Sequence, residues 1–264
     1  MRGSSAGPYA EIESELAETP FASIRYVEET ASTNADAAKL LAGDRCGGHT
    51  IVAEYQSHGA GRKGRTWEAA AGTSLLFSTI LPRTLPASRL WLVPFWVALA
   101  VRSALARASV PTILQWPNDV LVDDRKIAGI LCQSQVTGAA ARVACGVGIN
   151  VTRSGARATP VEQIAAFCED VAPVQRAALL KAVLQNYGAT LGLLDEPRRV
   201  VERWEAAADV PGRRYRIQLD GVNEVFDATA QRLEIGGALR VRRDNGTDQL
   251  VEMADARVLR PGAG

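Results

Sequence analysis

Residues 54–67 read Glu-Tyr-Gln-Ser-His-Gly-Ala-Gly-Arg-Lys-Gly-Arg-Thr-Trp. In this stretch three glycines alternate with the cations Arg62, Lys63 and Arg65, and a short apolar run precedes them. Glycine has no Cβ, so backbone N–H groups and guanidinium groups in such a loop can approach an anion closely. The same pattern also fits a nucleic-acid contact or an ordinary surface loop. The stretch therefore predicts a strand that leads into a basic, glycine-rich loop, with a phosphate site as one of three interpretations.

The composition bounds the class of protein. With 264 residues, of which 47% are hydrophobic, the chain can form one large domain, or a large one and a small one, around a substantial core. The formal net charge is only +1, so the molecule as a whole has no field that would draw it to DNA or to an anionic membrane. Anion binding must therefore depend on local clusters of cations.

Cysteine and histidine usage argues against a resident metal centre. The four cysteines show no Cys-x-x-Cys spacing, and the chain has only two histidines.

The N-terminus lacks the apolar segment of a signal peptide, and no apolar run reaches transmembrane length. We therefore expect reduced thiols, a cytoplasmic location and no membrane partner.

Hydrophobic periodicity and turn residues predict an α+β fold, in which a mixed, mostly antiparallel sheet packs against helices. The predicted strands of this sheet are 24–27, 50–55, 74–81, 113–115, 120–122, 127–133 and 142–151. Helices are predicted over 34–41, 86–108, 177–194 and 200–208. Ser32 or Thr33 is the expected N-cap of the first helix, and Pro94 is expected to kink or split the second.

The pattern changes after Pro211-Gly212. From Arg213 onward, short alternating runs are separated by turn dipeptides such as Asp220-Gly221 and Asn245-Gly246. These features predict a small β-barrel. The expected organisation is a flexible N-terminal arm over residues 1–23 with a helical turn near 11–16, a catalytic domain over 24–210, and a small C-terminal β-barrel domain over 211–264.

Three segments occur in a fixed order: Gly-Ala-Gly-Arg-Lys-Gly-Arg-Thr-Trp at 59–67, Gln-Trp-Pro-Asn-Asp at 115–119 with Arg-Lys-Ile-Ala-Gly-Ile-Leu at 125–131, and Gly-Val-Gly-Ile-Asn at 146–150. With Ser-Thr-Asn at 32–34 and Gln56 upstream, this set resembles the biotin protein ligases (biotin–acetyl-CoA-carboxylase ligases) over about residues 24–260. The resemblance implies an α+β catalytic domain followed by a small β-barrel. It also implies an activity that uses ATP and Mg²⁺ to join biotin to AMP, and then passes the biotinyl group to a lysine of a biotin carboxyl carrier protein.

The same resemblance assigns roles to individual residues. It implies contacts to biotin from Ser32, Thr33, Gln56, Gly59, Ala60, Lys126 and Gly129, with Ser32, Thr33 and Gln56 at the ureido ring and Lys126 at the carboxylate and the α-phosphate. It implies contacts to ATP from Arg62, Arg65, Trp67, Asn118 and Asn150, with the two arginines at the phosphates and Trp67 and Asn150 at the adenine. Lys126, Arg62 and Arg65 are the expected catalytic residues. The ligands of Mg²⁺ stay open, with Asp119 as one candidate.

These residue types suit that chemistry independently. A carboxylate that attacks an α-phosphorus brings two anions together, so cations placed in advance lower the barrier, and no protein nucleophile is required. A glycine-rich loop that orders over the adenylate would exclude water until the lysine arrives. Structural roles remain open for single residues: Ser32 as a helix cap, Trp67 as core, and Asn118 and Asp119 as turn formers.

Two positions depart from the family pattern, which usually has Arg at position 60 and Lys at position 115, where this chain has Ala60 and Gln115. Because both changes remove positive charge, a sensor that binds biotin or an adenylate without turnover is an alternative function. A lipoate-type ligase is a second alternative, although its typical Arg-Arg-x-Ser/Thr-Gly-Gly-Gly element is absent. Only 28 residues precede Glu29, too few for a winged helix-turn-helix, so no nucleic-acid partner is expected.

Overall fold

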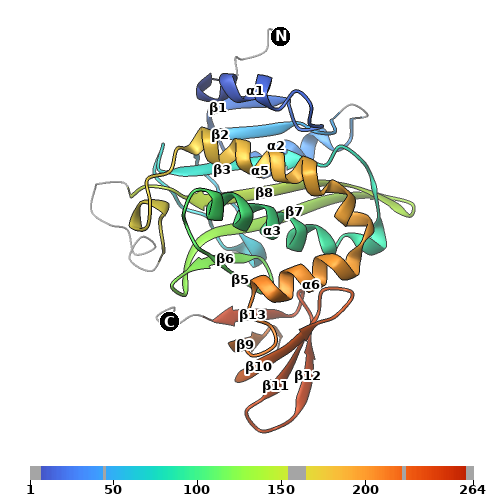
Figure 1. The fold of residues 1–264 in the computed structure, drawn as a ribbon. Helices are drawn as coiled ribbons and strands as arrows, with labels where there is room; N and C mark the ends of the chain where they lie inside the picture. Colours follow the sequence, from blue (N-terminus) through green and yellow to red (C-terminus); the bar gives the residue numbers. More distant parts are fainter. Residues whose placement is uncertain (1–6, 44–45, 154–164, 222–223, 260–264) are drawn as a thin grey trace.

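The structure, a computed structural model, describes residues 7–43, 46–153, 165–221 and 224–259 (Figure 1). Its centre is a large sheet with the strand order β1-β2-β3-β8-β7-β6-β5, and the short β4 pairs with β8. Among the described strand pairs of this sheet, β1 and β2 are parallel and the others are antiparallel, which confirms the predicted mixed, mostly antiparallel sheet. The strands are β1 Ile24–Thr30, β2 Thr50–Gln56, β3 Ser74–Ile80, β4 Leu85–Pro86, β5 Ile113–Gln115, β6 Asp119–Val122, β7 Arg125–Thr137 and β8 Ala140–Asn150.

Helices cover both faces of the large sheet. Along β8, Ala144 belongs to the apolar cluster beneath α2, whereas its neighbour Cys145 belongs to the core beneath the long helices, because successive side chains of a strand point to opposite faces. The helices are α2 Thr33–Leu40 on one face, and α3 Leu92–Arg107, α5 Arg176–Thr190 and α6 Pro197–Ala207 on the other, with helical turns η3 Ala87–Arg89, η4 Cys168–Asp170 and η5 Leu191–Asp195. No helix of the described residues is both long enough and apolar enough to cross a membrane.

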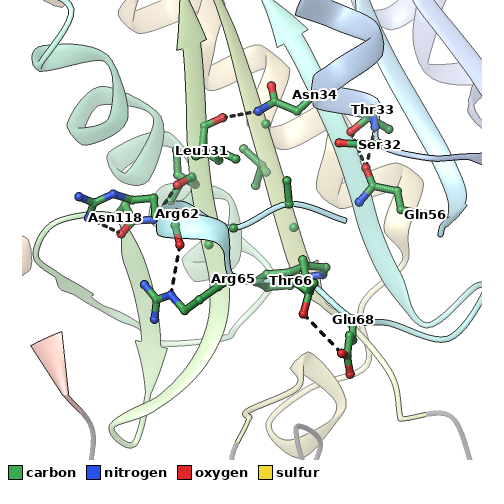
Figure 2. A pocket seen from close by; sticks show the side chains of 18 of the residues that line it. Ser32, Thr33, Asn34, Gln56, Arg62, Arg65, Thr66, Glu68, Asn118 and Leu131 are labelled. Carbon is green, nitrogen blue, oxygen red and sulfur yellow. Dashed lines mark hydrogen bonds between the residues drawn. The ribbon is translucent and has the colours of Figure 1, made fainter. Parts of the chain in front are cut away.

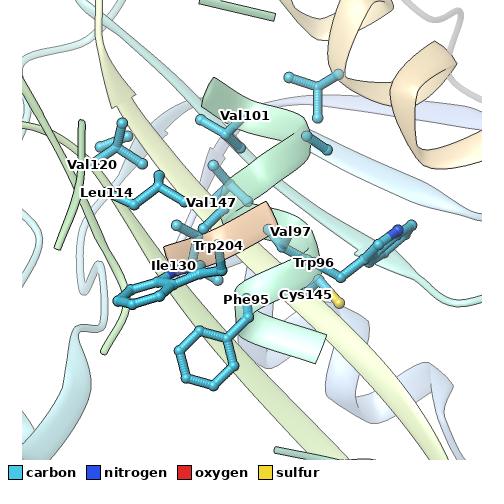
Figure 3. Close-up of a cluster of buried hydrophobic side chains, with 14 of the residues drawn as sticks. Phe95, Trp96, Val97, Val101, Leu114, Val120, Ile130, Cys145, Val147 and Trp204 are labelled. Carbon is cyan, nitrogen blue, oxygen red and sulfur yellow. The ribbon is translucent and has the colours of Figure 1, made fainter. Parts of the chain in front are cut away.

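The main core lies between α3 and the sheet (Figure 3). The Trp96 ring stacks on the Tyr187 ring of α5 with 4.7 Å between centroids, and Phe95 meets Trp204 of α6 edge-on at 5.3 Å. Aromatic pairs of this kind add to the stabilisation from burial alone. The three long helices are therefore held together by aromatic residues of α3.

Pro94 was predicted to kink or split the element over 86–108; the element is divided, but before Leu92 and not at Pro94. Helix α3 begins at Leu92, so Pro94 lies in its first turn and the helix continues to Arg107 as one element. In the first turn the backbone N–H groups have no acceptor inside the helix, so a residue without an N–H fits there at little cost. The residues before Leu92 form the separate turn η3.

The N-terminal segment is not a flexible arm over its described part. Residues 7–23 include η1 Gly7–Tyr9 and α1 Ala10–Glu15, which confirms the predicted helical turn. Tyr9, Ile12, Leu16 and Phe21 are each at most 5% exposed and belong to the main core. The prediction failed because these apolar residues are spaced singly through an acidic background, where local composition does not show that they reach a core. Residues 1–6 lie outside the described residues.

A second sheet of five strands follows at the C-terminal end, with the order β12-β11-β10-β9-β13. The predicted barrel is wrong: the described strands form an open sheet with β12 and β13, four residues each, at its two edges. Alternation and turn dipeptides predict strands and hairpins, but closure depends on long-range register that they do not encode. The strands are β9 Arg214–Leu219, β10 Val225–Leu233, β11 Leu239–Arg243, β12 Asp248–Val251 and β13 Ala256–Leu259.

The small sheet packs directly on the large one. The Trp116 indole N–H donates to the carbonyl of Gly237 at 3.0 Å, and the Trp116 backbone N–H donates to the Tyr215 hydroxyl at 3.3 Å. Trp116 and Tyr215 are buried. The segment between β5 and β6 is therefore fixed by the small sheet, while the domain boundary between residues 210 and 211 stays a prediction.

Burial of the N-terminal segment leads to a stability prediction. Leu16 is fully buried, so Leu16→Ala should lower the free energy of unfolding by about 2–5 kcal/mol, through lost burial and the cavity left behind. Urea denaturation measures the change. Glu18→Ala, on the exposed side of the same segment, should change the free energy by no more than about 0.5 kcal/mol. A neutral Leu16→Ala would mean that the segment does not pack in solution.

Candidate active site

A cavity of about 270 Å³ opens on the α2 face of the large sheet (Figure 2). Its walls come from the start of α2, the end of β2, the glycine-rich loop, and strands β7 and β8. Eleven of the residues predicted for the site line it: Ser32, Thr33, Gln56, Ala60, Arg62, Arg65, Trp67, Asn118, Lys126, Gly129 and Asn150. Gly59 and Asp119 are not part of the lining.

The end of the cavity at α2 is a network of neutral polar groups. Gln56 Oε1 accepts hydrogen bonds from the backbone N–H and the hydroxyl of Thr33, at 2.7 and 2.9 Å. The Thr33 hydroxyl also lies 2.9 Å from Ser78 Oγ on β3. Ser32 is the N-cap of α2, as predicted, and its Oγ accepts from the N–H of Ala35 at 3.5 Å. Ser32, Thr33 and Ser78 are buried and Gln56 is half-buried, and their hydrogen bonds hold these groups in place for a polar, uncharged ligand group.

The glycine-rich loop is a closed hairpin. Ala60 and Thr66 form an antiparallel bridge, and the N–H of Gly61 donates to the carbonyl of Arg65 at 2.7 Å. At the neck, the N–H of Trp67 donates to the carbonyl of Gly59 at 2.8 Å, and a Cβ on Gly59 would lie 2.3 Å from the carbonyl oxygen of Trp67. A side chain at position 59 would therefore prevent the neck of the loop from closing, so Gly59 is needed for the conformation of the loop although it does not line the cavity.

Two glycines under the Trp67 ring make the floor of the cavity flat. Gly129 of β7 and Gly148 of β8 are directly paired across the sheet. A Cβ on Gly148 would lie 2.6 Å from the Trp67 ring, and one on Gly129 would lie 2.8 Å from Lys126 Nζ and 3.0 Å from the ring. No real Cβ tolerates the 2.6 Å contact of Gly148 with a fixed ring, whereas a Cβ on Gly129 would require the flexible end of Lys126 to move and the ring to shift slightly. The close approach of the loop to the sheet therefore depends on Gly148 and is eased by Gly129.

The other end of the cavity is cationic. Lys126 Nζ lies 2.6 Å from the Asp119 carboxylate and 5.3 Å from the centroid of the Trp67 ring. Arg62 donates to the side-chain oxygen of Asn118 at 3.3 Å, and Asn118 donates to the carbonyl of Ile130 at 2.7 Å. Burial lowers the pKa of the Arg62 guanidinium, and the Asp119 carboxylate opposes this shift. Arg62 and Lys126 thus approach one carboxylate from two elements.

The amide of Asn150 is bonded to the protein backbone. Its nitrogen donates to the carbonyl of Ala166 at 3.1 Å and to that of Lys126 at 3.3 Å. In this structure the side chain therefore ties the end of β8 to the segment after residue 165 and to the start of β7. Its predicted contact with adenine stays a prediction.

Several lining residues were missed by sequence reasoning. Asn34 donates to the carbonyl of Leu131 at 3.1 Å, and a Cβ on Gly146 would lie 2.9 Å from its Cγ. Both residues lie within the quoted motifs, and Gly146, Gly148 and Asn150 share a face of β8 because a strand repeats every two residues. That alternation is the signal that could have found Gly146 and Gly148. The remaining ones carry no such signal; they are Gly61, Thr66, Glu68, Ile130, Leu131, Val147 and Ala165.

Comparisons with known proteins bear on this arrangement. The sequence model of the biotin/lipoate A/B protein ligase family matches residues 26–150. The biotin–[acetyl-CoA-carboxylase] ligase of Mycobacterium tuberculosis is 30% identical over 209 residues, which is 75% of this chain and 76% of that protein. The chain belongs to the biotin protein ligase family.

Two further comparisons agree with this membership. The biotin–[acetyl-CoA-carboxylase] ligase of Paracoccus denitrificans is 39% identical over 128 residues, covering 46% of this chain and 52% of that protein. The biotin protein ligase from Aquifex aeolicus, solved in complex with biotin and ATP, superposes with a TM-score of 0.71 at 22% identity, over 90% of this chain and 99% of that one. At that identity the superposition shows a common fold.

The two departures from the pattern of the biotin protein ligases lie in different places. Ala60 lines the cavity and takes part in the backbone bridge with Thr66. Gln115 is buried behind the cavity, opposite Asp119 in the β5–β6 pair. The first departure therefore removes a side chain from the cavity wall, whereas the second changes the surroundings of the carboxylate that binds Lys126.

The flat floor leads to a prediction for this member of the biotin protein ligases. Gly148→Ala should lower the free energy of unfolding by about 1–3 kcal/mol, because the new methyl group displaces the Trp67 ring. Chemical denaturation measures the loss, which should shrink in a Trp67→Ala background. Gly192→Ala is the control, since no atom lies within 4 Å of its Cβ position. An equal loss with and without the Trp67 ring would contradict the clash.

Proposed function

We propose that this chain is an ATP-dependent biotin protein ligase, which activates biotin as biotinyl-AMP and transfers the biotinyl group to a lysine of a biotin carboxyl carrier protein. The observation that carries the proposal is one cavity with two unlike ends. A neutral network around Thr33 and Gln56 suits a ureido ring, and the cations Arg62 and Lys126 suit a carboxylate beside phosphates. The name of the Mycobacterium tuberculosis relative supports the same substrates.

In the first step, an oxygen of the biotin carboxylate attacks the α-phosphorus of ATP, a new C–O–P bond forms, and the bond to the pyrophosphate leaving group breaks. Two anions must approach each other, so the positions of the cations decide the rate. We assign Lys126 to the carboxylate and the α-phosphate, and Arg62 and Arg65 to the phosphates. Asp119 holds Lys126 at 2.6 Å, which keeps its ammonium group in the cavity when no ligand is present.

Mg²⁺ fits this chemistry as a partner of the nucleotide. The described residues contain no group of three or more His, Cys, Asp or Glu that could hold a metal ion. In phosphoryl-transfer sites Mg²⁺ keeps most of its waters and binds through phosphates and one or two carboxylates, so such a group is not required. Bound there, the ion would neutralise charge on the leaving pyrophosphate. Asp119 is the carboxylate at hand, and its role as a ligand stays a prediction because it pairs with Lys126.

In the second step, the amine of the carrier lysine attacks the acyl carbon of biotinyl-AMP, an amide forms and AMP leaves with the bonding electrons. The mixed anhydride reacts with water unless the cavity excludes it. The hairpin loop covers the floor made by Gly129 and Gly148 and places Arg62 beside Asn118. We propose that this loop retains the intermediate until the carrier protein binds. The four cysteines are free, and we propose that the reaction takes place in the cytoplasm.

Biotin-dependent exchange between ATP and labelled pyrophosphate tests the proposal directly. Exchange should occur with biotin and not with lipoate or octanoate. Exchange with lipoate alone would overturn the assignment in favour of a lipoate-type ligase. Tight binding of biotin without exchange would favour a sensor, a function to which the missing side chain at Ala60 points.

Removal of the Lys126 ammonium group should abolish the activation of biotin by ATP. Lys126→Ala is expected to slow pyrophosphate exchange by about a hundredfold or more, the usual effect of deleting a group that stabilises developing charge. Lys39→Ala is the matched control, because Lys39 pairs with Asp36 on the surface of α2. Exchange by Lys126→Ala at close to the wild-type rate would remove Lys126 from the mechanism.

Arg62→Gly should release biotinyl-AMP faster than the wild-type protein. Deleting one charge-assisted contact to a phosphate corresponds to an increase of about tenfold or more in the release rate. The measurement is a chase of labelled adenylate from the protein through a desalting column, with Arg232→Gly, an exposed arginine of the small sheet, as the control. Equal retention by both variants would count against a covering role for the loop.

A further inference from the structure

The glycine-rich loop is bonded to the small C-terminal sheet as well as to the large one. Lys63 Nζ forms an ion pair with the Asp220 carboxylate and donates to the carbonyl of Ala256 at 3.0 Å. The neighbouring Arg62 donates to the carbonyl of Met253. Asp220 follows β9, Met253 lies in the connection between β12 and β13, and Ala256 is the first residue of β13. Two successive loop residues are thus attached to one edge of the small sheet.

Most of the Lys63 side chain is covered, since it is 14% exposed, whereas its partner Asp220 is 34% exposed. Holding a long, covered side chain in one conformation requires fixed partners, because its rotamer freedom is lost. Lys63 also has a φ of 57°, a left-handed conformation that is costly for a residue with a Cβ. Its contacts to Asp220 and Ala256 hold the loop tip in this conformation.

Asp220 is itself held in place. The Arg257 side chain donates to its other carboxylate oxygen at 3.0 Å, and its backbone N–H donates to the carbonyl of Asp255 at 2.7 Å. The hydrogen bond from Lys63, followed by the charges of Lys63 and Arg257, lowers the pKa of the Asp220 carboxyl. The partner of Lys63 is therefore ionised and oriented by the small sheet before any ligand binds.

We infer that Asp220 is a positioning residue of the ligase site: by holding Lys63 it keeps the glycine-rich loop, and with it Arg62, over the cavity before the nucleotide binds. The inference rests on the proposed function for its kinetic consequence. Ordering a loop during binding reduces affinity, and a loop that is already ordered avoids this loss. The Lys63–Asp220 pair should therefore act on the Michaelis constant for ATP and on retention of the adenylate, with little effect on the chemical step.

Limited proteolysis of the ligand-free protein tests the attachment without any assay of activity. Trypsin cleaves after Arg62, Lys63 and Arg65, and mass spectrometry of the fragments reports cleavage at these bonds. Asp220→Asn should raise the cleavage rate about three- to tenfold, because the loop opens more often when the ion pair is lost. The control is Asp244→Asn, which breaks the 2.6 Å pair with Arg214 in the same sheet and should leave loop cleavage unchanged. Equal cleavage in Asp220→Asn and the wild-type protein would overturn the inference.

Kinetics of pyrophosphate exchange test the consequence. Asp220→Asn should raise the Michaelis constant for ATP about three- to tenfold while kcat stays within about twofold, and Lys63→Ala should do the same. Since both changes break one contact, the double variant should be no worse than either single variant. Asp220→Glu should restore most of the affinity. Additive effects, or a loss confined to kcat, would contradict positioning through Lys63.

The two experiments separate the inference from the proposed function. If the wild-type protein catalyses exchange but Asp220→Asn changes neither cleavage nor the Michaelis constant, the function stands and the inference fails. If Asp220→Asn accelerates cleavage of the loop while the wild-type protein shows no exchange with biotin, the attachment stands and the ligase assignment fails.

Discussion

The close approach of the Trp67 ring to two paired glycines is the contact on which the site depends. Gly129 and Gly148 lie opposite each other on adjacent strands, and a Cβ on either would overlap the ring or the Lys126 side chain. A large sheet usually presents side chains on every position of a face, which would keep the loop about a side chain's depth away. With that layer missing, the loop reaches the backbone of the sheet. Arg62 and Arg65 of the loop then line the same cavity as Lys126, which comes from the sheet itself.

Because the loop lies so close to the sheet, one buried carboxylate, that of Asp119, is near both Arg62 and Lys126 at the cationic end of the cavity. Asp119 stands at the start of β6, where it faces Lys126 at 2.6 Å and lies close enough to Arg62 to oppose the lowering of the Arg62 pKa that burial causes. Cations gathered around a phosphate site repel one another when no phosphate is present, and a shared carboxylate reduces that repulsion. Asn118 and Asp119 are therefore more than turn formers: their side chains bind Arg62 and Lys126 respectively.

Much of the fold could be predicted from local sequence. Alternation and turn residues place β2, β3 and β8 within a few residues, and Ser32 was recognised as the cap of α2. Features that depend on distant parts of the chain could not be predicted. The burial of Leu16 follows from contacts with the main core, and the open edges of the small sheet follow from the absence of pairing between the described strands β12 and β13, which no local pattern specifies. Pro94 was misjudged because its effect depends on where the helix begins.

The cavity residues were predictable where they lie in contiguous motifs. The attachment of the loop to the small sheet was not predictable, because Lys63 and Asp220 are far apart in the chain.

The attachment of the loop to the small sheet bears on the departure at Ala60. The bridge from Ala60 to Thr66 is made by backbone groups, so it does not require an arginine at this position. The loop is then kept in place by the neck at Gly59, by Arg62 and by Lys63, which are bonded to Trp67, Asn118 and Asp220. An arginine at position 60 would add charge to the cavity, but it is not needed to fold the loop, and Arg62, Arg65 and Lys126, which we propose as the phosphate contacts, line the cavity without it.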